Sequence, residues 1–129
     1  MPHIQIDYSA NLDAALDMGA FCEAMRAAAV EVEAFPMPGI RVRAVRVDHW
    51  AIADGNPAHG FVDISVRLRE GRPQDVKEAA IAQLFGAARA FLAPAMATRS
   101  IALSAEMRDI DAALSPKTGT IREHLKAPA

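Results

Sequence analysis

The sequence predicts an α+β fold in which two consecutive β-α-β units form a two-layer structure, with both helices on one face of a sheet. Three observations support this prediction. Four segments alternate apolar and polar residues with period two, two longer segments carry apolar residues at helical spacing, and the order strand, helix, strand occurs twice. Because each helix and each strand has one apolar side, these sides are best buried against one another.

The first unit begins with a strand over His3–Tyr8, in which isoleucine and tyrosine alternate with polar side chains. A helix over Leu12–Val32 follows, and Asn11 is its predicted N-cap. The apolar residues of this helix recur at the spacing expected for one buried face; they are Met18, Phe21, Cys22, Met25, Ala28, Ala29 and Val32.

The next strand is expected over Arg41–Asp48, and its pattern changes part of the way along. Two arginines near its start share one parity, whereas Arg46 and Asp48 take the opposite parity. A change of parity within a strand indicates an extra residue on one side of the ladder. We therefore expect a β-bulge, or a change of partner, between Ala44 and Val45.

The second unit follows a Gly/Pro/His-rich connection around Gly55–Gly60 and contains strands over Phe61–Arg69 and Ile101–Arg108. Between them a helix is expected over Pro73–Leu92, with the proline in its first turn and Pro94 ending it. Its apolar face consists of Val76, Ala80, Leu84, Ala87, Ala88 and Phe91.

The chain length of 129 residues predicts one domain over 1–129. Its two halves, about 2–57 and 58–112, match in layout far more than in sequence, which is compatible with an internal duplication. The remaining stretch, 113–129, is expected to form a C-terminal arm available for contacts between subunits. The unpaired strand edges of such a sheet also favour association.

Composition argues against several classes of function. The formal net charge is -2, and the fourteen Lys and Arg residues are spread along the chain, so a basic nucleic-acid-binding face is not expected. Cys22 is the only cysteine, which excludes an intrachain disulfide and a CxxC redox pair. Charged residues interrupt the apolar stretches, and no secretory signal begins the chain, so we expect a cytoplasmic protein without a membrane span.

Common catalytic motifs are missing. The sequence has no Gly-rich phosphate loop and no serine in a nucleophile elbow, and its four histidines do not have metal-ligand spacing, so neither a metal nor a cofactor is expected. Pro2 is the unusual feature, because removal of Met1 would give it a free secondary amine. Burial or a nearby cation would lower the pKa of that amine toward the range useful for proton transfer. A proline at this position is also simply typical of a chain start.

Two arginines are candidates for binding an anion. Arg41 begins a strand after a Pro/Gly turn, and Arg72 lies in the turn before the second helix, where binding groups tend to collect. A guanidinium group can hold a carboxylate through two parallel hydrogen bonds. Taken singly, each is more typical of a solvated surface arginine. Trp50, the only tryptophan, is a possible pocket wall, although a core position is more common for this residue type.

Taken together, several blocks of the sequence resemble the 5-carboxymethyl-2-hydroxymuconate isomerases of the tautomerase superfamily. The blocks occur in order and with the expected spacing over nearly the whole chain. They are Pro2–Ile4, Tyr8–Leu12, Gly39–Arg43, Val47–Gly55, Glu70–Arg72 and Ile101–Glu106.

This resemblance implies a cytoplasmic homotrimer that isomerises an unsaturated 2-hydroxy diacid, a dicarboxylate or tricarboxylate, from the dienol to the conjugated 2-oxo form. The implied pathway is bacterial homoprotocatechuate degradation. Pro2 would be the acid/base catalyst, and Arg41 and Arg72 would hold the substrate carboxylates and the 2-oxo oxygen. Two alternatives remain open. One is a tautomerase that acts on a different oxo or enol acid, and the other is a trimeric carboxylate-binding module without catalysis.

Overall fold

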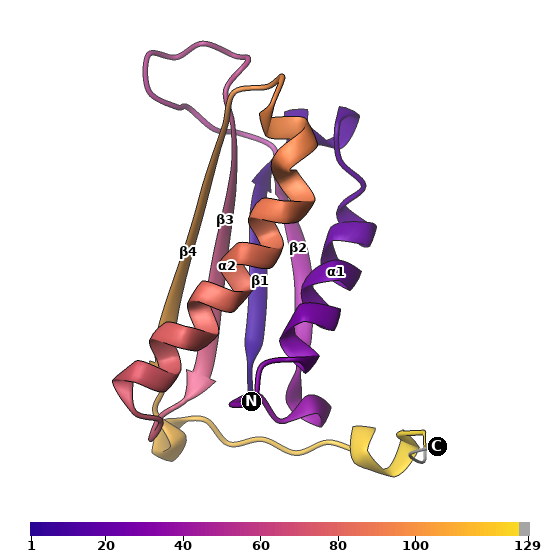
Figure 1. The fold of residues 1–129 in the computed structure, drawn as a ribbon, viewed down its shortest axis with the longest axis vertical. Coiled ribbons are helices and arrows are strands. Elements are labelled where there is room, and N and C mark those ends of the chain that lie inside the picture. The colour runs from indigo at the N-terminus through magenta and orange to yellow at the C-terminus, as the bar shows by residue number, and fades with distance from the viewer. Residues whose placement is uncertain (127–129) are drawn as a thin grey trace.

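A four-stranded mixed sheet forms one layer of the computed structural model, which describes residues 1–126 (Figure 1). The strand order is β2-β1-β3-β4; β1 pairs parallel with β2 and antiparallel with β3, and β3 pairs parallel with β4. The strands are β1 His3–Ser9, β2 Arg41–Val47, β3 Gly60–Arg69 and β4 Ile101–Ile110.

Both helices, α1 (Met18–Val30) and α2 (Gln74–Met96), lie on the same face of the sheet (Figure 1). The predicted two-layer α+β fold of two β-α-β units is therefore confirmed. The core forms where the apolar sides of β1 and β3 meet those of the helices. Its fully buried side chains include Ile4, Ile6, Val62, Ile64, Val66, Phe21, Met25, Leu84 and Leu92.

The predicted start of the first helix is wrong. A short 3-10 turn covers Ala10–Ala14, and α1 begins only at Met18. Its N-cap is Asp17, whose carboxylate accepts a hydrogen bond from the backbone N–H of Ala20 at 2.9 Å. Asn11 makes a contact distant in sequence instead, because its side-chain amide donates to the carbonyl oxygen of His59 at 3.0 Å.

The predicted bulge in β2 is also wrong. Each residue of Arg41–Val47 pairs in turn with a residue of β1, without an interruption. Arg46 has the parity of the helix-covered face, but it lies near the end of an edge strand. There its guanidinium reaches Asp48 at 3.0 Å and Asp13 at 3.4 Å, and Asp13 also accepts a hydrogen bond from the Tyr8 hydroxyl at 2.8 Å. Contacts with carboxylates outside the helices thus explain why an arginine occurs on the otherwise apolar side of β2.

Helix α2 continues past Pro94, where the sequence predicted its end, and reaches Met96. Proline removes one N–H donor from a helix, and near the last turn this loss affects only one bond. The turn closes after the proline, because the N–H of Ala97 donates to the carbonyl oxygen of Ala93 at 3.1 Å. The position of the proline within the last turn therefore explains why the helix tolerates it.

By length and composition alone, α2 is apolar enough to cross a membrane, with a mean hydropathy of 1.3 over an 18-residue window. This finding departs from the expectation that charges interrupt every long apolar stretch. In the structure, one side of the helix packs on the sheet through Ala80, Leu84, Ala88 and Leu92. That packing is typical of a core helix in a two-layer fold.

The two ends of the sheet carry different features. The start of β1 and β2 and the end of β3 and β4 lie at one end, and the loop between β2 and β3 lies at the other (Figure 1). After β4, the chain forms a 3-10 turn over Ala112–Leu114 and crosses below the N-terminus to a second such turn over Ile121–His124 (Figure 1). The last residues of the predicted arm, 127–129, lie outside the described part.

Candidate functional site

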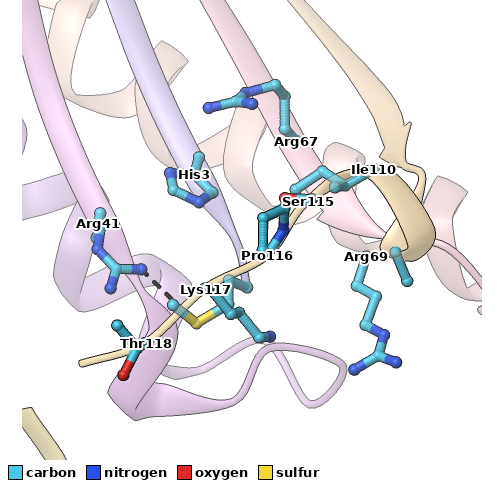
Figure 2. A pocket seen from close by; sticks show the side chains of 11 residues that line it. His3, Arg41, Arg67, Arg69, Ile110, Ser115, Pro116, Lys117 and Thr118 are labelled. Carbon is cyan, nitrogen blue, oxygen red and sulfur yellow. Dashed lines mark hydrogen bonds between the residues drawn. The ribbon is translucent and has the colours of Figure 1, made fainter. Parts of the chain in front are cut away.

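A cavity of about 420 Å³ lies at the N-terminal end of β1, on the face of the sheet that the helices do not cover (Figure 2). It contains five basic side chains when His3 is counted, and none of its lining residues is acidic. The lining residues are Met1, His3, Arg41, Arg67, Arg69, Ile110, Ala112, Ser115, Pro116, Lys117 and Thr118. A cavity of this composition is suited to a small anion that carries several negative charges.

Strand register brings the first basic residues together. His3 on β1 pairs with Arg41 on β2 and, on its other side, with Arg67 on β3. Side chains in register on neighbouring strands project from the same face of a sheet. Arg69 lies two residues beyond Arg67 and therefore has the same parity. The row of cations is thus a direct product of the pairing of the three strands.

Pro2 is fully buried at the edge of this cavity, and its carbonyl oxygen accepts a hydrogen bond from the N–H of Arg41 at 3.2 Å. Met1 is joined to the Pro2 nitrogen by the peptide bond, and the Sδ of Met1 lies 3.7 Å from a terminal nitrogen of Arg41. Met1 also lines a second cavity of about 340 Å³, next to Gly39. Loss of Met1 would therefore join the two cavities and leave the Pro2 nitrogen at their junction.

The environment of the N-terminal amine favours its neutral form. Burial has the largest effect and lowers the pKa of the amine below the ordinary value of 8.0. Four positive charges lower that pKa further, and in order of effect they are Lys117, Arg72, Arg69 and Arg41. The nitrogen of Pro2 is one residue along the chain from this amine, so we expect the same burial and charges to favour a neutral amine there after Met1 is removed.

His3 is held in its neutral form beside this amine. Burial lowers the pKa of its imidazole below 6.5, and the nearby guanidinium groups of Arg67, Arg41 and Arg43 lower it further. Its Nδ1 is buried and has no hydrogen-bond partner among residues 1–126. A neutral imidazole can donate or accept a hydrogen bond, so His3 adds a polar group without a further full charge.

Arg72 is close to the cavity but is not among its lining residues. Its Nε and one terminal nitrogen donate to the carbonyl oxygen of Ala34 at 3.2 and 3.0 Å, and the other terminal nitrogen donates to the carbonyl oxygen of Arg69 at 3.0 Å. Three of its five N–H donors are thus used on the backbone. The structure places Arg41 in the cavity and Arg72 behind it, and the role of Arg72 in substrate binding stays a prediction.

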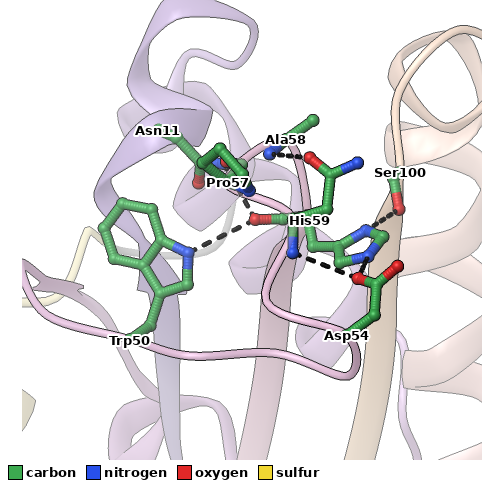
Figure 3. Close-up of polar contacts among 8 residues, drawn as sticks. Asn11, Trp50, Asp54, Pro57, Ala58, His59 and Ser100 are labelled. Carbon is green, nitrogen blue, oxygen red and sulfur yellow. Dashed lines mark hydrogen bonds and ion pairs between the residues drawn. The ribbon is translucent and has the colours of Figure 1, made fainter.

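Trp50 is at the opposite end of the sheet, after β2, and lines a different cavity of about 310 Å³. Its indole N–H donates to the carbonyl oxygen of His59 at 3.3 Å, beside the amide of Asn11 (Figure 3). The His59 ring lies between Ser100 at 2.6 Å and Asp54 at 2.8 Å (Figure 3). These contacts tie the β2–β3 loop to the sheet, and within one chain Trp50 is not a wall of the cavity at Pro2.

Three cavity residues were not singled out from the sequence, namely Arg67, Arg69 and Lys117. The first two have the parity of the uncovered face, but only the antiparallel register of β3 with β1 shows that they stand beside His3. Lys117 belongs to a stretch without periodic structure, so nothing local in the sequence indicates it. Among residues 1–126, no group of three or more His, Cys, Asp or Glu side chains is arranged to hold a metal ion.

Comparisons with known proteins identify the family. A family model described as 5-carboxymethyl-2-hydroxymuconate isomerase matches residues 2–125. A 5-carboxymethyl-2-hydroxymuconate Delta-isomerase of Escherichia coli is 27% identical over 126 residues, which are 98% of this chain and 100% of that protein. A crystal structure of a 5-carboxymethyl-2-hydroxymuconate delta-isomerase is 33% identical and has a TM-score of 0.90, over 100% of this chain and 95% of the other.

A solved fused 4-OT, described as a wild-type symmetric trimer, shares the fold at a TM-score of 0.68 and 18% identity, over 90% of this chain and 93% of the other. At that identity the likeness concerns the fold only. The family model, by contrast, spans nearly the whole chain and both β-α-β units. The chain therefore belongs to the 5-carboxymethyl-2-hydroxymuconate isomerase family.

Proposed function

We propose that this chain, after loss of Met1, is a 5-carboxymethyl-2-hydroxymuconate Delta-isomerase that uses the amine of Pro2 as its acid and base. It acts in the cytoplasm, in homoprotocatechuate degradation. The observation that supports this most is the position of Met1, which is bonded to the Pro2 nitrogen and lines two cavities beside basic side chains, with no acidic residue in the lining of either cavity. The activity carried by the names of the relatives fits this arrangement.

The charge of the substrate matches the cavity. Its name denotes a hexadienedioate that carries a carboxymethyl group, and therefore three carboxylates. Arg41 lines both cavities, which supports the proposal that its guanidinium group holds a substrate carboxylate. Arg67 and Arg69 line the larger cavity and supply the further positive charge that a multiply charged anion requires.

In the proposed reaction, the neutral amine of Pro2 takes the proton of the 2-hydroxyl group. The oxygen electron pair then forms the carbonyl bond, the double bonds shift along the chain, and a carbon takes the proton back from the Pro2 ammonium. Negative charge develops on the 2-oxygen during this step, and fixed cations beside it lower the barrier. One group that both removes and returns the proton makes a cofactor unnecessary.

Arg72 fits this scheme in two ways. Its charge lowers the pKa of the N-terminal amine, and its hydrogen bond to the carbonyl oxygen of Arg69 holds the backbone of a cavity residue. Two of its N–H donors have no partner among the described residues, which is compatible with the proposed contact to a substrate oxygen.

The proposal includes a homotrimer. Strands β2 and β4 are the two edges of the sheet, and their unpaired backbone groups favour association with further copies of the chain. The fused 4-OT trimer with the same fold supports this assembly. The native mass in solution should correspond to three chains, and a stable monomer would contradict this part of the proposal.

The decisive test is an ultraviolet assay of 5-carboxymethyl-2-hydroxymuconate ketonisation, with protein whose N-terminal mass shows that Met1 is absent. We expect saturable conversion above the buffer rate, and Pro2→Ala should lower kcat by about a hundredfold or more, because a primary amine differs in basicity and geometry. Activity on another enol acid alone would indicate a different tautomerase. Binding without proton exchange, unchanged in Pro2→Ala, would indicate a carboxylate-binding module.

A further inference from the structure

The C-terminal arm reaches the cavity at Pro2 from a fixed starting point. The N–H of Ala112 donates to a carboxylate oxygen of Glu70 at 3.2 Å, and the N–H of Ala113 donates to the Asp111 carboxylate at 3.0 Å. The first bond ties the start of the arm to the turn after β3, and the second caps the 3-10 turn over Ala112–Leu114. Pro116 then restricts the backbone of the arm, which passes below the N-terminus (Figure 1).

Lys117 is the basic residue that the arm brings to the cavity. It lines both the 420 Å³ cavity and the adjoining 340 Å³ cavity, and Arg41 is the other basic side chain that does so. Figure 2 shows its side chain between those of Arg41 and Arg69. No salt bridge of Lys117 occurs among residues 1–126. Its ammonium group is thus a charge placed at the junction of the cavities without an acidic neighbour.

We infer that Lys117 is a substrate-binding residue, which holds one of the three carboxylates of the isomerase substrate and closes the site from the side of the arm. This inference rests on the proposed function. The arginines of β2 and β3 approach the substrate from the sheet, whereas the lysine approaches from the opposite wall, so the two sets of cations hold different parts of the anion. A lysine serves here as a compact charge with three donors.

The charge of Lys117 also affects the pKa of the amine that is the proposed base. Of the four charges that lower the pKa of the N-terminal amine, that of Lys117 acts most strongly. Removal of this charge should therefore raise the pKa of the Pro2 amine as well as weaken substrate binding. The pH profile reports this effect of charge on the amine, whereas the change in KM reports substrate binding.

The test compares Lys117→Gln with Lys117→Arg and with Lys126→Gln, a matched control that removes the same charge from an exposed position on the same arm. In the ketonisation assay, Lys117→Gln should raise KM about tenfold to a hundredfold, as expected for a lost hydrogen bond to a charged group. Its acid limb in kcat/KM should move to higher pH. Lys117→Arg should restore most of both properties, and Lys126→Gln should resemble the wild type.

The outcomes separate this inference from the proposed function. An active wild type together with a Lys117→Gln variant of unchanged KM and unchanged pH profile overturns the role of Lys117 and leaves the isomerase proposal intact. An inactive wild type overturns the isomerase proposal. In that case, calorimetric titration of the wild type and Lys117→Gln with the same tricarboxylate decides whether Lys117 binds it, because equal affinities would overturn the binding role as well.

Discussion

The guanidinium group of Arg72 holds the carbonyl oxygen of Ala34 with two N–H donors, at 3.2 and 3.0 Å. Ala34 lies after α1, and Arg72 lies in the turn before α2, so this contact joins the two β-α-β units beside the cavity. An arginine fork makes such a double contact, whereas a lysine supplies only a point charge. The contact therefore makes Arg72 a residue that positions the backbone as well as a source of positive charge.

We expect Arg72→Ala to lower the free energy of unfolding by about 1 to 3 kcal/mol, because two backbone carbonyl groups lose a charged donor. Arg72→Lys should recover the charge but only part of the stability. Urea denaturation measures the first effect and steady-state kinetics the second. Unchanged stability in Arg72→Ala, together with a higher KM, would show that binding of substrate is its only role.

The acid limb of kcat/KM should lie below the pH at which an ordinary N-terminal amine titrates. The surroundings that lower the pKa of the Met1 amine are expected to lower that of the Pro2 amine once Met1 is removed, and activity is lost as pH falls through this lowered pKa because it requires the neutral amine. High salt screens the cations but does not remove the effect of burial, so the limb should move only part of the way toward higher pH. Rate profiles at low and high ionic strength test this expectation. A shift to lower pH in high salt would contradict the role of the cations.

Burial of His3 should make the folded protein less stable in acid. Its imidazole has a folded-state pKa below 6.5, so between that pKa and 6.5 the unfolded chain binds more protons and stability rises with pH. The contribution of neutral His3 to stability is complete above pH 6.5, and it is lost as the pH falls from 6.5 to the folded-state pKa. We expect His3→Gln to reduce the loss of unfolding free energy between neutral pH and about pH 5. An identical pH dependence in the variant and the wild type would rule out this effect.

Gly60 stands where a side chain has no room. A Cβ atom there would lie 2.8 Å from Cδ2 of Leu12 and 3.0 Å from Oγ of Ser9, both buried. We expect Gly60→Ala to lower the free energy of unfolding by about 1 to 3 kcal/mol through overpacking. Gly86→Ala, in an exposed and open position on α2, is the control and should raise stability by about 0.5 to 1 kcal/mol. Equal effects of both substitutions would contradict the steric argument.

The alternation of apolar and polar residues predicted the fold well, because the arrangement of strands and helices follows from which side chains are buried. Three strands and both helices occur where apolar residues repeat with period two or with helical spacing, and β2 occurs where the alternation changes parity part of the way along. The errors involve side chains whose partners are distant or polar. Asn11 bonds to His59 rather than capping a helix, and Arg46 finds Asp13 and Asp48 where its parity indicated a bulge. The periodicity of apolar residues along the chain does not indicate which side chains form hydrogen bonds or ion pairs with each other.

The candidate site was predictable only in part, for a related reason. Pro2 and Arg41 follow from a chain start and from a turn before a strand, which are local features. Arg67 and Arg69 join them only through the register between β1 and β3. Lys117 is brought in by a segment without regular structure. The sequence placed Trp50 beside these residues as a possible wall, but the direction of β2 takes it to the other end of the sheet.

Met1 fills the junction of the two cavities and blocks the only nitrogen that Pro2 has. Under the proposed chemistry, a chain that keeps Met1 is inactive, and removal of Met1 by an aminopeptidase produces the active enzyme. The specific activity of a preparation then measures the fraction of trimmed chains. An N-terminal affinity tag, unless cleaved directly before the proline, would yield a protein without the free amine that the proposed chemistry requires.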